Sequence, residues 1–238
     1  MYICGVPKNL VEFSKLVDFE QALFGDRALS PEASFELFKK RPEIYTAVVC
    51  PRGSVAAYLT TYPLLPNYAE ALIEGDITEP ELTPDMLLTR HDNLEGSCIY
   101  IGSVVVDKKL DPILKSILLI SLAQFHVRQL QADAVRRFSV IMTTVSKEGE
   151  RLVNWIGAEK LNDGANRKDG LDVYGRTITQ GFIYQACTAV ERFFDNKFVH
   201  IDFPSRPAGN FGLAGVEACH GHVAKADDLE RNGATTLR

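Results

Sequence analysis

The sequence has few cysteines, and their positions argue against a disulfide framework. Only five occur in 238 residues, with no metal-ligand spacing between them. An odd number of scattered cysteines is typical of free thiols in a reducing compartment. The sequence therefore predicts a cytoplasmic protein. The five are Cys4, Cys50, Cys98, Cys187 and Cys219.

Targeting signals and long apolar runs are also missing. The segment Met1 to Leu10 has no basic region followed by an apolar core, so we expect no signal peptide there. The densest apolar stretch, Pro112 to Val127, contains Lys115, Ser116 and His126 and falls short of the ~20 residues of a membrane span. We interpret this stretch as a buried helix and predict no membrane partner.

The sequence contains none of the motifs that mark several common classes of functional site. There is no Walker-type loop, dinucleotide glycine motif, Gly-x-Ser-x-Gly elbow or His-Glu-x-x-His helix. The run Cys219 to His222 lacks a second ligand cluster, so we predict no metal site. A net charge of -5 argues against nucleic acid as a partner. The 46% of hydrophobic residues indicates an ordinary globular chain.

The most informative stretch runs from Cys98 to Ala158. Cys98 to Val106 is β-branched and aromatic enough for a buried strand, and Asp111-Pro112 then begins a long apolar helix. Arg137 to Thr144 is the next predicted strand. Ser146 can cap a short amphipathic helix that Gly157 ends in a left-handed conformation. A helix that connects two strands of one sheet in this way predicts a parallel pair.

The first hundred residues predict further elements around this stretch. Met1 to Val6 can form a strand, a helix follows until Gly25, and a second helix is capped by Ser30-Pro31. Strands at Tyr45 to Cys50 and Val55 to Tyr62 flank a Pro-Arg-Gly turn and predict a hairpin.

An acidic segment follows the hairpin. Between Gly53 and Thr89 there is no Lys or Arg, and we interpret the segment as either a solvated connection with short helices or an acidic rim that attracts a cationic substrate. Its acidic residues are Glu70, Glu74, Asp76, Glu79, Glu81 and Asp85.

The C-terminal part is less regular. Leu171 to Thr179 alternates like a late strand, and Ile183 to Phe194 is predicted to be helical. From Pro204 the chain is rich in Gly and Ala. We therefore predict one domain over residues 1–203, with its core in 1–179 and a C-terminal helix at 183–194. Residues 204–238 are predicted to form a loosely packed or flexible tail.

The order of paired helices, hairpin, strand, long helix, strand and short helix resembles the GNAT-type N-acetyltransferase superfamily over about Met1 to Thr179. The best local match is Ser146 to Ala158 (SKEGERLVNWIGA). The resemblance implies an α/β fold in which a mixed, mostly antiparallel central sheet is flanked by helices. A parallel strand pair in that sheet splays apart.

The resemblance also implies acetyl-CoA or another acyl-CoA as donor substrate. Its pantetheine arm would lie along the strand that includes Val104, Val105 and Val106, and its diphosphate in the loop that follows. The family motif there has Arg or Gln, Gly, and Gly or Ala at the positions of Asp111, Leu114 and Ser116. An acidic cap and a proline at this helix start oppose a diphosphate, whereas three lysines nearby could compensate. The donor-binding candidates after the strand are therefore Lys108, Lys109, Lys115, Ser116, Thr144 and Ser146.

Catalytic candidates follow from the same resemblance. The family often has a tyrosine acid on the short helix, but Val153 occupies that position here. Tyr100, Tyr174 and Ser146 are alternative proton donors, and the base could be Glu74, Glu95 or His91.

The resemblance implies an N-acyltransferase that moves an acyl group to a small-molecule or peptide amine by direct attack. Two alternatives are kept: a catalytically inactive GNAT-like domain that binds a ligand or partner, and an acyltransferase with a donor other than CoA. A homodimer is left open.

Overall fold

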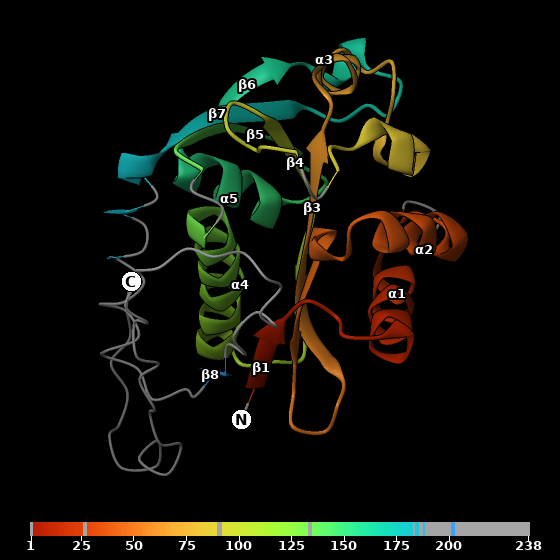
Figure 1. Cartoon of the computed structure of the whole chain (residues 1–238), viewed down its shortest axis with the longest axis vertical. Helices are drawn as coiled ribbons and strands as arrows, with labels where there is room; N and C mark the ends of the chain where they lie inside the picture. The colour runs from red at the N-terminus through yellow and green to blue at the C-terminus, as the bar shows by residue number, and fades with distance from the viewer. Residues whose placement is uncertain are drawn as a thin grey trace.

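The computed structural model describes residues 2–25, 28–89, 92–132, 135–182, 184, 185, 188, 201 and 202, and all structural statements concern these residues. One mixed sheet forms the centre, in the order β6-β7-β5-β4-β3-β2-β1-β8 (Figure 1). β4 and β5 are parallel in the middle of the sheet, between antiparallel neighbours. The predicted mixed, mostly antiparallel fold class is confirmed. The strands are β1 (Tyr2–Gly5), β2 (Tyr45–Val49), β3 (Val55–Leu64), β4 (Cys98–Val106), β5 (Arg137–Thr143), β6 (Glu159–Asn162), β7 (Val173–Thr179) and β8 (Ile201–Asp202).

Helices cover both faces of this sheet (Figure 1). α1, α2 and α3 pack on one face, where Leu16 and Leu37 are fully buried against Tyr45 of β2. α4 and α5 pack on the other face, where Leu118 of α4 is fully buried. Each such leucine contributes about 1.5–3 kcal/mol by leaving water. The helices are α1 (Leu10–Phe24), α2 (Pro31–Lys40), α3 (Pro66–Glu74), α4 (Pro112–Ala132) and α5 (Lys147–Ile156).

The predicted helix ends are confirmed by their hydrogen bonds. Ser30 Oγ accepts from the Ala33 amide at 3.2 Å, and Ser146 Oγ accepts from the Gly149 amide at 3.1 Å. Gly157 ends α5 with φ 66°, a left-handed conformation that glycine adopts without a Cβ clash. These caps are local, so the sequence alone specifies them.

The sequence prediction misses both edge strands. In β6, Glu159, Lys160 and Leu161 are all exposed, so the strand lacks the alternation that identifies a half-buried strand. β8 is only two residues long and pairs with β1. The late strand begins at Val173 and not at Leu171. Most of the helix predicted for 183–194 and the whole predicted tail, 204–238, lie outside the described residues.

The acidic segment forms the short helices that were predicted, namely α3 and the 3₁₀ turns η3 (Glu79–Glu81) and η4 (Pro84–Met86). It packs on the α1–α2 face, where Leu72 and Leu82 join the core. The interpretation of a uniformly solvated connection is wrong for Glu79, which is partly buried, whereas Glu70 and Glu74 are exposed. The apolar contacts of the segment carry Glu79 inward.

Candidate functional site

The parallel strands β4 and β5 part at one end. Their pairing begins at Cys98 with Ser139 and stops at Ile101 with Met142, although β4 continues to Val106. Beyond Ile101, β4 pairs only with β3. Its backbone groups on the β5 side therefore have no strand partner from Gly102 to Val106, and they are available to a ligand. The predicted splay is confirmed.

A bulge lies where the two strands part. Leu59 of β3 faces Val104 and Thr61 faces Ile101, so Thr60 alone faces both Gly102 and Ser103. The Ser103 amide donates to Thr60 Oγ1 at 2.7 Å in place of a ladder bond. Bulges redirect side chains and are frequent beside functional sites.

Glu79, Tyr100 and Thr143 form a hydrogen-bonded cluster at this point, which we call the Glu79 cluster. The Tyr100 hydroxyl donates to Glu79 Oε2 at 2.9 Å and lies 3.1 Å from Thr143 Oγ1. Tyr100 is on β4 and Thr143 is the last residue of β5, so the cluster connects the two strands that part. An acid and a phenol thus meet at the edge of the opening.

The absence of a side chain at Gly102 admits Glu79 to this position. A Cβ at Gly102 would collide with Glu79 Oε1 and would lie 2.7 Å from Cε2 of Tyr62. Burial raises the pKa of Glu79 to about 7, the Tyr100 hydrogen bond opposes this rise, and the Glu20 carboxyl adds to it. Burial, followed by the Glu79 carboxylate, raises the pKa of Tyr100 well above its usual value. At neutral pH Glu79 can therefore exchange a proton while Tyr100 remains a phenol.

A second buried acid lies behind the bulge. Glu20 of α1 is 2% exposed, and its Oε1 accepts from the hydroxyls of Tyr58 at 3.2 Å and Ser103 at 3.3 Å. Burial raises the pKa of Glu20, against these two hydrogen bonds. Glu20 thus fixes the Ser103 side of the bulge and acts electrostatically on Glu79.

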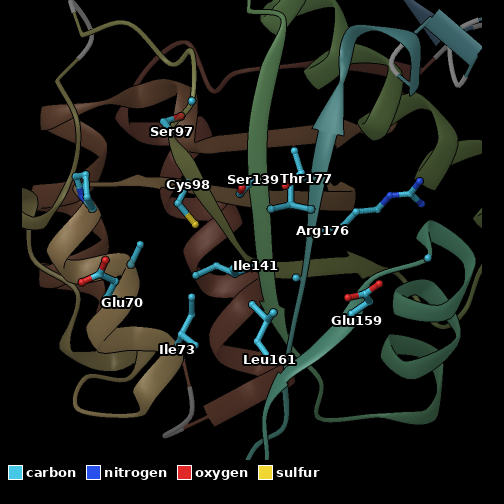
Figure 2. Close-up of a pocket in the computed structure, with 16 residues that line it drawn as sticks. Glu70, Ile73, Ser97, Cys98, Ser139, Ile141, Glu159, Leu161, Arg176 and Thr177 are labelled. Atoms are coloured by element: carbon cyan, nitrogen blue, oxygen red, sulfur yellow. The ribbon is translucent and has the colours of Figure 1, made fainter.

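A hollow of about 880 Å³ lies beside the Glu79 cluster, over β5 and β7 (Figure 2). Glu70 of α3 lines one side and Glu159 of β6 lines the other, and both are exposed. Ile141 lines the hollow and is the register partner of Tyr100, whereas Glu79, Tyr100 and Thr143 do not themselves line it. The Arg176 guanidinium lies 4.5 Å from the centre of the Phe182 ring and donates to the Ile156 carbonyl, so it is engaged outside the hollow.

The loop between β4 and α4 fits a diphosphate poorly. Asp111 Oδ1 accepts from the Ile113 amide at 2.8 Å, and Pro112 has no amide. Lys115 Nζ donates to the Lys108 carbonyl at 2.7 Å and so is turned to the protein's own backbone. The splayed strands thus suit an extended arm, whereas the helix start already has an anionic cap.

The other predicted donor-binding residues lie around the same opening. Val105 faces the α1–α2 core and Val104 and Val106 face the α4 side. The Lys109 amide donates to Asp107 at 2.9 Å, and the Ser116 hydroxyl donates back along its helix at 3.1 Å. Thr144 and Ser146 lie between β5 and α5, and Ser146 is the helix cap described above.

The catalytic candidates do not all meet. Tyr100 is in the Glu79 cluster, but Tyr174 packs on the α5 face of the sheet and donates to Asp172 Oδ2 at 3.3 Å. Glu74 is exposed at the end of α3, and Glu95 accepts from the Arg136 amide at 2.6 Å. His91 lies outside the described residues. Val153 is buried in the core, where it cannot transfer a proton.

Sequence reasoning did not select Glu79 as a catalytic candidate. It counted Glu79 only among the acidic residues of the connection. Its signal, a glutamate between Thr78 and Pro80 in an acidic run, does not differ from those of its neighbours. Only the packing of that segment on Gly102 identifies it.

Within the described part of the chain, no group of three or more His, Cys, Asp or Glu side chains could hold a metal ion. The run from Cys219 to His222 is outside that part. No described helix is long and apolar enough to cross a membrane.

Comparison with solved structures identifies the fold. One similar structure is the NatC complex bound to Gag peptide and CoA, with a TM-score of 0.50, 10% identity, and coverage of 75% of this chain and 98% of that chain. Another is mosquito arylalkylamine N-acetyltransferase like 5b, with a TM-score of 0.50, 12% identity, and coverage of 75% and 100%. The sequence matches no protein-family model and no curated protein. At these identities the likeness establishes that the chain has the fold of GNAT acetyltransferases.

Proposed function

We propose that this protein is an N-acyltransferase that moves an acyl group from a pantetheine thioester to an amine. The observation that carries the proposal is the Glu79 cluster, an acid with a pKa of about 7 hydrogen-bonded to a buried phenol where β4 and β5 part. The GNAT fold supports an acyltransferase, and one structural neighbour is a complex with CoA. In this proposal the opening receives the donor arm, and the hollow over β5 and β7 receives the acceptor.

The donor would lie along β4 from Gly102 to Val106, where unpaired backbone groups can bind the amides of a pantetheine arm. Bound acyl-CoA would supply an activated thioester carbonyl. The bulge at Gly102 and Ser103 turns the β4 backbone at the same level as Tyr100, which suits hydrogen bonding to a carbonyl oxygen.

Glu79 and Tyr100 would move the protons of the reaction. Glu79 accepts the proton that the attacking amine loses as its nitrogen bonds to the acyl carbon. The Tyr100 hydroxyl donates a proton to the sulfur as the carbon–sulfur bond breaks. It then recovers a proton from Glu79 across their 2.9 Å hydrogen bond. Both residues return to their starting states, because the one proton that the neutral amine loses equals the one that the sulfur gains; an amine that arrives as ammonium first gives its extra proton to water.

The acceptor would be a small-molecule or peptide amine that enters through the hollow. One neighbour is bound to a peptide, and the name of another specifies an arylalkylamine. Here the exposed carboxylates of Glu70 and Glu159 face the hollow from opposite sides, which favours a cationic acceptor. Replacing both by Gln should raise KM for the amine and leave kcat unchanged.

Release of free thiol from acetyl-CoA in the presence of a panel of amines tests the proposal. Glu79→Gln should reduce kcat by about 10²–10⁴-fold, the contribution of a general base. Glu74→Gln is the matched control, because Glu74 is exposed at the end of α3 and outside the cluster. Wild-type protein that binds the donor but releases no thiol with any amine would favour the inactive, ligand-binding alternative.

The Asp111 cap favours a second candidate donor, an acyl group on a pantetheine arm without the CoA diphosphate. The α4 amide that a diphosphate would use is already bonded to Asp111. Acetyl-pantetheine and acetyl-CoA should then give equal kcat/KM. A large advantage for acetyl-CoA would restore CoA as the donor.

A further inference from the structure

The loop between β6 and β7, residues 163–172, packs on the end of α3. Arg167 of this loop is only 7% exposed, and its Nη1 donates to the carbonyls of Leu72 and, at 3.0 Å, Ile73. These carbonyls lie in the last turn of α3, where a helix lacks its own donors and carries a partial negative charge. The Arg167 guanidinium both donates hydrogen bonds to these carbonyls and offsets their partial negative charge.

The position of Arg167 is fixed from two sides. Asp169 holds the guanidinium through a bidentate pair, with Nε to Oδ1 at 3.0 Å and Nη2 to Oδ2 at 2.7 Å. On the α3 side, Gly75 ends the helix with φ 87°, and a Cβ there would lie 2.8 Å from Cγ of Arg167. The fork geometry and this close approach restrict the site to an arginine against a glycine.

Two neighbouring side chains extend the same contact. Lys168 Nζ donates to the Asp76 carbonyl at 2.7 Å and pairs with Glu81 Oε2 at 2.7 Å. Asn162 Nδ2 donates to the Ile73 carbonyl at 2.9 Å. The loop, together with Asn162 at the end of β6, therefore contacts the chain before Glu79, at residues 72–76, and after it, at Glu81.

Glu79 depends on these contacts because its own carboxyl has one direct hydrogen-bond partner among the described side chains, Tyr100. Residues 75–81 contain no strand that would tie them to the sheet. The apolar contacts of Ile77 and Leu82 and the polar contacts of the β6–β7 loop therefore hold the segment, and with it the carboxyl against Gly102. A desolvated carboxyl that is released from such a position moves toward water.

We propose that Arg167, together with Lys168, is a positioning residue that holds the α3–η3 segment so that Glu79 stays against Tyr100 and Gly102. The catalytic consequence rests on the proposed function, but the positioning itself does not. Loss of the contact between Arg167, Lys168 and the α3–η3 segment releases Glu79 from its place where β4 and β5 part. The β6–β7 loop thus controls whether the base is in place.

The direct test is the titration of Glu79 by ¹³C NMR of glutamate-labelled protein, with the signal assigned by its loss in Glu79→Gln. The ionisable groups that act on Glu79 are Glu20 from α1, Tyr100 from β4, and Tyr45, Tyr58 and Tyr62 from β2 and β3. Arg167→Ala alters none of these, but it removes the cation that pairs with Asp169, whose charge acts on Tyr100. An unpaired carboxylate near the cluster would raise the pKa of Glu79, so a fall reports movement of Glu79 toward water. The pKa should fall by at least one unit from about 7 toward its ordinary 4.5.

Matched variants keep this test decisive. Lys160→Ala removes a cation from the same hairpin, but the described partners of Lys160 are Asp163, Asp172 and the Tyr174 ring, all within the hairpin, so the titration should not move. Arg167→Lys keeps the charge without the fork and should give an intermediate shift. If Arg167→Ala does not fold, as judged by circular dichroism, Lys168→Met provides a milder release. An unchanged Glu79 titration in the folded variants would overturn the proposal.

Activity then separates this inference from the proposed function. Arg167→Ala should lower kcat by about tenfold or more, with little change in the donor KM, and should move the acidic limb of the pH profile downward. If wild-type protein releases no thiol with any amine, this would refute the acyltransferase function alone. A normal kcat and pH profile in Arg167→Ala would refute the positioning role alone.

Discussion

Replacing Glu79 by Gln should abolish a pH-dependent loss of stability that the buried carboxyl causes. The pKa of this carboxyl is about 7 in the folded protein and 4.5 as its ordinary value. Between these values the unfolded chain has released a proton that the folded chain retains. The free energy of unfolding therefore falls as pH rises through this window, because the unfolded state binds fewer protons.

The magnitude follows from the size of the shift. A rise of about 2.5 units, from 4.5 to about 7, at ~1.4 kcal/mol per unit gives about 3 kcal/mol of stability lost between the two pH values. Gln cannot ionise and has nearly the same shape. The free energy of unfolding of Glu79→Gln minus that of the wild type should therefore increase by about 3 kcal/mol between pH 4.5 and 7.

Urea unfolding at half-unit steps from pH 4.5 to pH 8 measures this difference. Glu74→Gln is the matched control, because Glu74 is exposed at the end of α3 and takes part in neither the Glu79 cluster nor the Lys168–Glu81 pair. Its difference should be flat over the measured range. A flat difference for Glu79→Gln as well would show a solvated carboxyl and remove the basis for Glu79 as the base.

Four further variants test the site. Tyr100→Phe should lower kcat at least tenfold without changing donor affinity, which steady-state kinetics and calorimetry with acetyl-CoA can separate. Asp111→Asn should tighten acetyl-CoA binding in calorimetry, because it removes a negative charge and keeps a capping side chain; unchanged affinity would place the diphosphate elsewhere. Replacing Lys109 and Lys115 by Ala should weaken that binding, and a deficit that persists at high salt would contradict an electrostatic role. Gly102→Ala should cost about 1–3 kcal/mol in urea unfolding, because its Cβ would overlap the carboxylate packed against it; a neutral result would refute the close approach.

The helices and the central strands follow from local features of the sequence. Ser146 and Gly157 bound α5 because a hydroxyl at the N-cap and a glycine after the last turn act within a few residues. The parallel pairing of β4 and β5 follows from the connecting helix α4, which leaves little other choice of direction. Asp111 was predicted as a helix cap for the same local reason, and its bond to the Ile113 amide confirms it.

The candidate site depends on contacts between distant segments, which a single sequence does not encode locally. Glu79 meets Tyr100 only because α3 packs on the sheet and Gly102 leaves room for a carboxyl. Arg167 reaches the end of α3 across 94 residues of chain. The sequence therefore determined the order of elements and the parallel direction of β4 and β5, and the opening between these strands was an implication of the family resemblance. The pKa of Glu79, and with it the chemistry, was decided by burial, which arises only when the tertiary structure excludes water from that carboxyl.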